Sequence, residues 1–151
     1  MRTNDHEVKV LNGLIESTID SADGYQEAAK DTESSRFTAH FQSRASERYQ
    51  VVTTLQQRVR ALGGTPDDDG TVLASAHRMF VNLRHLLSKD DTGVVDEVER
   101  GEAHIKAKFE GALKDDQVSP ATKQVITFAY TSVKNGHDQI RDLKHALHNA
   151  A

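Results

Sequence analysis

Residues 91–115, DTGVVDEVERGEAHIKAKFEGALKD, decide the fold of this chain. Glu102 interrupts the apolar stripe of this stretch, at a position where a core side chain is expected. A carboxylate that faces a core is strongly unfavourable unless it is paired, protonated or bound to a metal. The stretch therefore predicts a core helix and a buried partner for Glu102. The stripe itself recurs at steps of three and four residues, the period of an α-helix with one buried face: Val94, Val95, Val98, Ile105, Phe109, Ala112 and Leu113.

The composition of the whole chain favours helices. The 151 residues are 36% hydrophobic, the mean hydropathy is −0.62, and there are two prolines. This combination is typical of amphipathic helices, each with a narrow apolar stripe and a broad solvated face. The length is that of one domain, and we expect residues 1–151 to form it.

Charge and cysteine content exclude several classes of function. The net charge of −4 argues against nucleic acid or an anionic membrane as the main partner. The absence of cysteine excludes disulfides, thiolate metal sites and iron–sulfur clusters. No apolar run approaches the length of a membrane span, and the N-terminal residues lack the apolar core of a signal peptide. We therefore expect a cytoplasmic protein without a membrane partner.

The periodicity predicts five helices, at about 5–31, 35–62, 71–87, 92–115 and 120–148. Asn4 and Glu7 resemble a capping box that opens the first helix. Gly63-Gly64-Thr65-Pro66 ends the second, and Ser119-Pro120 starts the last. Four long helices and a short one between the second and third predict an all-α fold. It is a ferritin-like antiparallel four-helix bundle with a short crossover helix.

Ferritin-like di-iron sites use Glu-x-x-His pairs, and this sequence lacks them where they are needed. Gln50 stands three residues after Glu47, and Glu102 stands three after Glu99. Carboxylates and one imidazole still fall at comparable depth along the expected hairpins, and they form a tentative metal set for iron or another divalent cation: Glu16, Asp20, Glu47, Glu99, Glu102 and His137. The favoured alternative is a buried Glu–Arg or Glu–His network, for which Arg44, Arg48 and Arg141 are near.

Five segments resemble a bacterial family of ferritin-like four-helix-bundle proteins, related to ferritin and rubrerythrin and known mainly as a domain of unknown function. They are LNGLIESTIDSADGYQEAA, GGTP, AHRMF, VERGEAHIKAKFEGAL and KNGHDQIRDL, at residues 11–29, 63–66, 76–80, 98–113 and 134–143. The resemblance implies a ferritin relative whose di-iron ligand set is altered or lost. It singles out Tyr25, His77 and Arg78 as structural polar residues, beside Glu102 and His137.

Three functions follow. The first is a non-catalytic bundle, stress-associated or partner-binding, with a polar core network around Glu102. The second is an enzyme, a divergent di-metal carboxylate protein with oxidase or metal-binding activity. The third is a self-assembly or adaptor module, with self-association as a dimer or binding of another protein. Fold alone does not choose between them.

Overall fold

The computed structural model describes residues 2–31, 35–69 and 91–150. Within these residues there are four helices and no strand: α1 (Arg2–Asp31), α2 (Ser35–Ala61), α4 (Asp91–Leu113) and α5 (Pro120–Ala150). The prediction of an all-helical chain is confirmed. The predicted helix at 71–87, with His77 and Arg78, lies outside the described residues.

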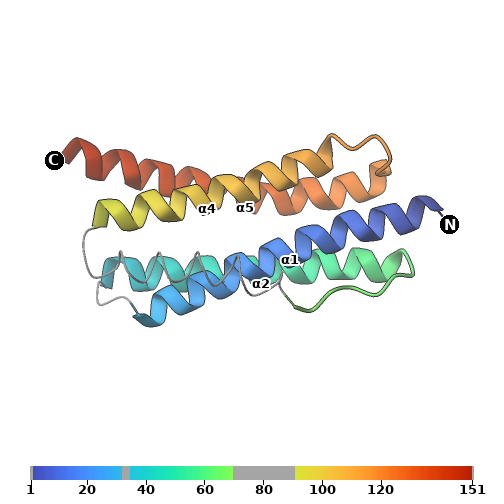
Figure 1. The fold of residues 1–151 in the computed structure, drawn as a ribbon, viewed down its shortest axis with the longest axis horizontal. Coiled ribbons are helices and arrows are strands. Elements are labelled where there is room, and N and C mark those ends of the chain that lie inside the picture. The colour runs from blue at the N-terminus through green and yellow to red at the C-terminus, as the bar shows by residue number, and fades with distance from the viewer. Residues whose placement is uncertain (1, 32–34, 70–90, 151) are drawn as a thin grey trace.

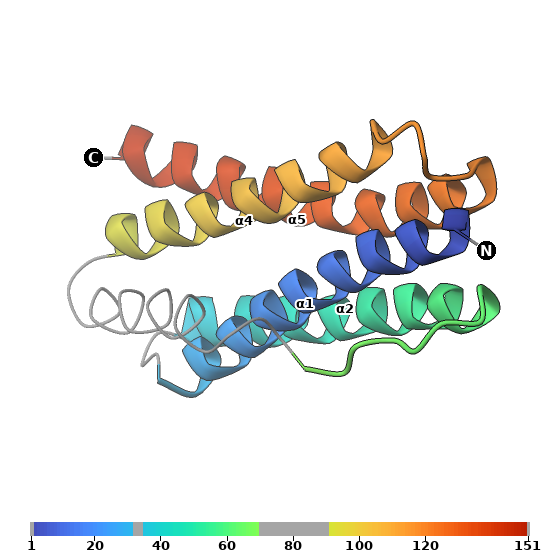
Figure 2. The same cartoon turned by 45° about the vertical axis from the view of Figure 1, so that its right-hand side comes forward.

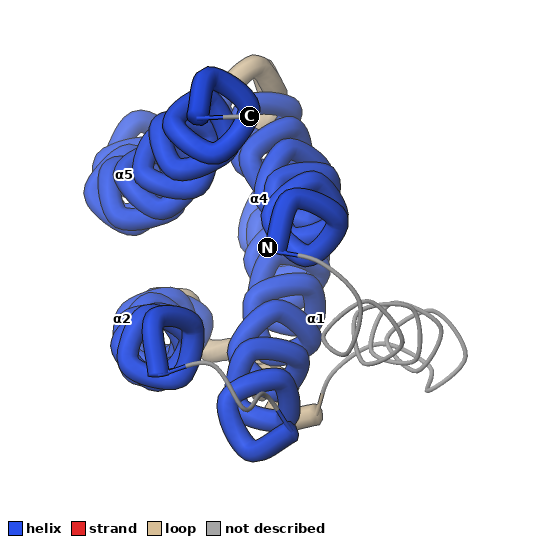
Figure 3. Tube along the Cα trace, turned by 90° about the vertical axis from the view of Figure 1, so that its left-hand side faces the viewer, coloured by secondary structure: helices blue, strands red, loops and turns tan. Residues whose placement is uncertain are grey.

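The four helices form two hairpins that lie side by side (Figure 1). α1 packs mainly on α2 and α4 mainly on α5, while α2–α5 and α1–α4 contacts join the hairpins. Neighbouring helices run in opposite directions, and Figure 2 shows the same arrangement from another side. Viewed along the helices, they occupy four corners (Figure 3). α2 ends and α4 begins at opposite ends of the molecule.

Two helix ends lie where the capping residues of the sequence predict them, and a third does not. α5 begins at Pro120, and the Thr122 amide donates to the Ser119 hydroxyl at 3.4 Å, as expected for an N-cap. α2 ends before Gly63, whose φ of 81° is left-handed. The predicted capping box is wrong, because α1 begins at Arg2 and places Asn4 and Glu7 inside the helix.

The loop after α2 is held on the first hairpin. A Cβ on Gly64 would lie 2.7 Å from Cγ2 of Val8, so a side chain here would push the loop off α1. The Asn12 side chain donates to the Thr65 carbonyl at 3.2 Å and accepts from the Asp67 amide at 2.9 Å. Residues 63–67 therefore have a defined path along α1.

Buried apolar side chains form two clusters, one in each half of the bundle. The first includes Leu55 and Phe109, and the second includes Phe41 and Ile140. On each helix, the stretch between the two clusters contains a residue that bonds to Arg48 or makes room for it, and with Arg48 itself we call these four residues the polar layer: Ser21, Arg48, Glu102 and Gly136. The core is therefore interrupted near its middle by charge.

Among the described residues, no helix is both long enough and apolar enough to cross a membrane.

Candidate functional site

Glu102 is buried and carries an ion pair with Arg48. Oε2 of Glu102 lies 2.5 Å from Nη2 of Arg48, and the two side chains are 2% and 0% exposed. Arg48 also donates from Nη1 to the Ser21 hydroxyl at 3.2 Å. The pair is thus a link from α2 to both α4 and α1, made where neither charge reaches water. Such a pair offsets the cost of burying two ions only when its geometry is good and its other polar atoms are bonded.

The second oxygen of Glu102 is bonded to Tyr25. The Tyr25 hydroxyl donates to Oε1 at 2.6 Å, and the guanidinium carbon of Arg48 lies 6.0 Å from the centre of the tyrosine ring. Burial, and after it the charge of Glu102, raise the pKa of the Tyr25 hydroxyl well above its usual range. Tyr25 therefore stays a neutral donor, and both oxygens of Glu102 are committed to protein partners.

Arg44, one turn before Arg48, links α2 to α5. Its Nη1 donates to Oε2 of Glu47 at 2.7 Å, and its Nη2 donates to Oε1 of Gln139 at 2.5 Å. Arg44 is buried, whereas Glu47 is 39% exposed and also accepts from the Ser132 hydroxyl at 3.3 Å. The arrangement is a buried cation neutralised by a carboxylate that reaches solvent.

Gly136 gives the two arginines room to approach α5. A Cβ at this position would lie 2.5 Å from Nη2 of Arg48, 2.9 Å from Oε2 of Glu102 and 3.1 Å from Nη1 of Arg44. Real Cβ atoms do not tolerate such contacts, and the neighbouring groups are held by their own hydrogen bonds. Gly136 is thus a requirement of the network. In the sequence it looks like one more small residue on an apolar stripe, so its role could not be read there.

The other predicted metal residues have different environments. Glu16 lies beside Asp67 of the loop after α2. A hydrogen bond with Asp67 is the largest cause that raises the pKa of Glu16, followed by burial and by the charges of Asp67 and Asp20. The charge of Lys108 acts in the opposite direction. Glu99 is half-buried on α4. Nδ1 of His137 is buried and has no hydrogen-bond partner within the described ranges; it lies 3.6 Å from Oδ1 of Asp138.

The structure therefore does not bring these six residues together in one cluster, and the metal set stays a prediction. Within the described ranges, no three or more His, Asp or Glu side chains lie together as a metal would require. Arg141, one of the three arginines expected near the glutamates, pairs instead with Asp138 and Asp142. The arginines that do reach glutamates are Arg44 and Arg48.

A second buried carboxylate, Glu7, fixes α1 to the start of α5. It accepts a short hydrogen bond from the Ser119 amide and one of 3.0 Å from the Thr122 hydroxyl, to which Arg58 also donates. Burial alone would raise the pKa of Glu7, but the bonds from Ser119 and Thr122 and the charge of Arg58 lower it below 4.5. Beside it, His6 bonds to Asp115 at 2.7 Å. The sequence did not predict this site, because the spacing of Asn4 and Glu7 resembles a capping box and so indicated a role for Glu7 within its own helix.

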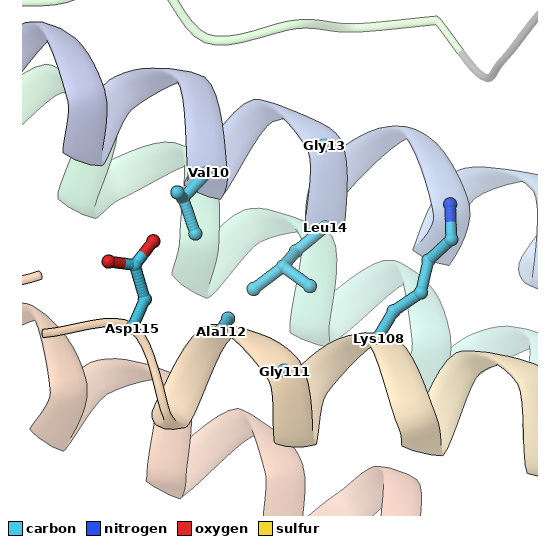
Figure 4. A pocket seen from close by; sticks show the side chains of 7 residues that line it. All are labelled: Val10, Gly13, Leu14, Lys108, Gly111, Ala112 and Asp115. Carbon is cyan, nitrogen blue, oxygen red and sulfur yellow. The ribbon is translucent and has the colours of Figure 1, made fainter. Parts of the chain in front are cut away.

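A groove of about 270 Å³ runs between α1 and α4 (Figure 4). Figure 4 shows Val10 and Leu14 facing Ala112 across it, with Lys108 and Asp115 towards its two ends. The charged groups are already bonded, since Lys108 donates to the Ser17 hydroxyl at 3.0 Å and Asp115 accepts from His6. No residue of the polar layer lines this groove. The groove and the buried charges are therefore separate features.

Comparison with known proteins gives a family and no characterised relative. No curated protein matches the chain. The family described as "Domain of unknown function (DUF2383)" matches residues 6–115, which include α1, α2, α4 and three of the four polar-layer residues. With well over half of its length matched, the chain belongs to this family of unknown function.

Proposed function

We propose that this chain is a non-catalytic, ferritin-like helical bundle in which an arginine–carboxylate network takes the place of a metal centre, and which acts by binding a second copy of itself or another protein. The observation that carries the proposal is Arg48, a fully buried guanidinium bonded to the one carboxylate on the core stripe. The arrangement of the helices supports the ferritin-like relationship. Two antiparallel hairpins are joined by a connection that begins at one end of the bundle and finishes at the other.

The residues present do not fit a di-iron centre. Metal-binding carboxylates need free oxygen lone pairs that face the ion. Each oxygen of Glu102 accepts one hydrogen bond, from Tyr25 or Arg48, and Oε2 of Glu47 accepts from both Arg44 and Ser132, so fewer lone pairs remain for an ion. A divalent cation beside Arg48 would also meet a buried positive charge at short range. The di-metal alternative requires Arg48 to leave Glu102, which would leave a cation in the core without a partner.

Metal analysis tests the first half of the proposal. Protein without a histidine tag is loaded with ferrous iron under anaerobic conditions, washed, and measured by mass spectrometry, beside Glu102→Gln and Glu110→Gln on the same helix. We expect less than one iron per chain in all three proteins, and ferrous oxidation no faster than in buffer. About two metals per chain that are lost in Glu102→Gln alone would overturn the proposal in favour of the di-metal alternative.

Light scattering tests the second half. Phe128 on α5 is 73% exposed, the one large hydrophobic side chain so exposed in the described residues. We expect the protein to be a dimer at tens of micromolar, and Phe128→Ser to weaken that dimer if α5 lies in the interface. Thr127→Ser, at the neighbouring exposed position, is the matched control. A monomer at this concentration would leave another protein as the proposed partner, to be sought separately.

A further inference from the structure

His40 is part of a line of basic side chains on α2. His40, Arg44 and Arg48 are each four residues apart, so they lie one helical turn from each other on the same face. Nε2 of His40 is buried and has no hydrogen-bond partner in the described part of the chain. The ring lies 6.0 Å from that of Phe41, centre to centre, at the edge of the second core cluster. A neutral imidazole fits this place, and a charged one would lack an acceptor.

Most of the charged and polar groups near His40 already have hydrogen-bond partners. Within the described residues, its ring feels the charges of Arg44 and Glu47 on its own helix and of Glu102 on α4. The two carboxylates are bonded to Arg44 and Arg48. From α1 and α5 this line of basic side chains meets the neutral groups Ser21 and Gln139. A proton on His40 would therefore add a third cation to a group in which each of these two carboxylates already pairs with an arginine.

We propose that His40 is an acid-sensitive switch: when its imidazole takes up a proton, repulsion from Arg44 loosens the contact between α2 and α5. Arg44 is the link at stake because its Nη2 holds Gln139 of α5. Its other bond, to Glu47, stays within α2 and does not join the hairpins. The loosening therefore falls between α2 and α5 near Gln139, while the opposite end of the bundle keeps the bonds of Glu7.

The direction of the pH effect follows from the imidazole. Burial first and the charge of Arg44 second hold the pKa of His40 below 6.5, although Glu102 and Glu47 act the other way. The unfolded chain therefore takes up this proton more readily than the folded one. The contribution of the neutral His40 imidazole to the free energy of unfolding is fully present above pH 6.5. It is lost as the pH falls from 6.5 towards the lowered pKa of His40 in the folded protein.

Hydrogen exchange followed by mass spectrometry tests the switch on the full chain. Between about pH 7.5 and pH 5, after correction for intrinsic rates, we expect opening around residues 40–48 and 132–140 to increase. The increase is up to about tenfold for each unit by which the pKa is lowered. His40→Gln should remove most of this increase, whereas His104→Gln, an exposed histidine on α4, should retain it.

Two outcomes would overturn the proposal. One is an unchanged increase in His40→Gln. The other is an NMR titration of the wild-type protein that gives a pKa of 6.5 or higher for the His40 imidazole. This measurement does not depend on whether the variant folds.

Discussion

The charge pair of Arg48 and Glu102 shows what a single residue can require of its surroundings. Each side chain is buried, and each would be left without a counter-ion if the other were removed. Around this pair, Tyr25 and Ser21 supply two further hydrogen bonds and Gly136 supplies space, while Nε of Arg48 is buried without a hydrogen-bond partner among the described residues. Residue-scale predictions can therefore be made for both the charge and the space.

Removing the cation should be costly. We expect Arg48→Met to lower the free energy of unfolding by about 3–5 kcal/mol at neutral pH, because Glu102 is then an uncompensated buried charge. Glu27→Gln, at an exposed carboxylate that pairs with the exposed Lys30, should cost about 1 kcal/mol or less. Urea unfolding measures both. Equal losses of unfolding free energy in the two variants would contradict a larger contribution from the buried pair.

Filling the space at Gly136 should also be costly. Alanine is the better helix former by about 1 kcal/mol, so an exposed helical glycine gains stability on this change. At Gly136 the new Cβ would instead meet Arg48 and Glu102, and we expect Gly136→Ala to destabilise. Gly13→Ala, on α1 with nothing within 4 Å of the added atom, is the control and should stabilise. Thermal unfolding of the two variants should shift in opposite directions, and a stabilised Gly136→Ala would contradict the packing described.

Single helices were largely predictable, but their partners were not. The three- and four-residue spacing of apolar side chains indicates the helices, and the outlier on the α4 stripe indicates a buried partner for Glu102. Which arginine would fill that role depends on the rotation of α2 against α4, which the spacing within either helix does not contain. The metal set, which stays a prediction, has the same limit, because equal depth along two hairpins does not fix the direction of a side chain. Glu16 shares a depth with the others and bonds instead to the loop at Asp67.

At the scale of elements, Glu7 makes the position of α1 sensitive to acid. Its lowered pKa means that its contribution to stability is present above pH 4.5 and is lost as the pH falls through the lowered value. We expect wild-type stability to fall more steeply than that of Glu7→Gln in this range. Asp5→Asn, exposed on the same turn, should follow the wild type. Denaturant unfolding between about pH 6 and pH 3 gives the slopes, and parallel slopes for wild type and Glu7→Gln would count against this role.

The whole molecule has a core in two parts with the polar layer between them. Such a layer lowers stability relative to an apolar core and has been found to favour one alignment of helices over others in some bundles. We infer that the layer selects the alignment in which Arg48 meets Glu102.

Replacing the charged pair of the layer, and the tyrosine bonded to it, with apolar residues tests that inference. We expect the triple variant Arg48→Met, Glu102→Leu and Tyr25→Phe to be as stable as the wild type or more so, because the two clusters then join. Its NMR amide signals should be broader or more numerous, since several alignments become similar in energy. Arg44→Met with Glu47→Leu, outside the layer, is the control. A triple variant with a single sharp set of signals would show that the apolar packing alone selects the alignment.

The polar layer also restricts how chain length can change in relatives of this protein. One residue inserted into a helix on either side of the layer would turn everything beyond it by about 100°. Either the charged residue of that helix or its residues in one of the two clusters would then face away from the core. Additions and losses of residues are therefore expected in the connections, such as 62–69 and 114–119, while each helix keeps a constant number of residues between the layer and the clusters beside it.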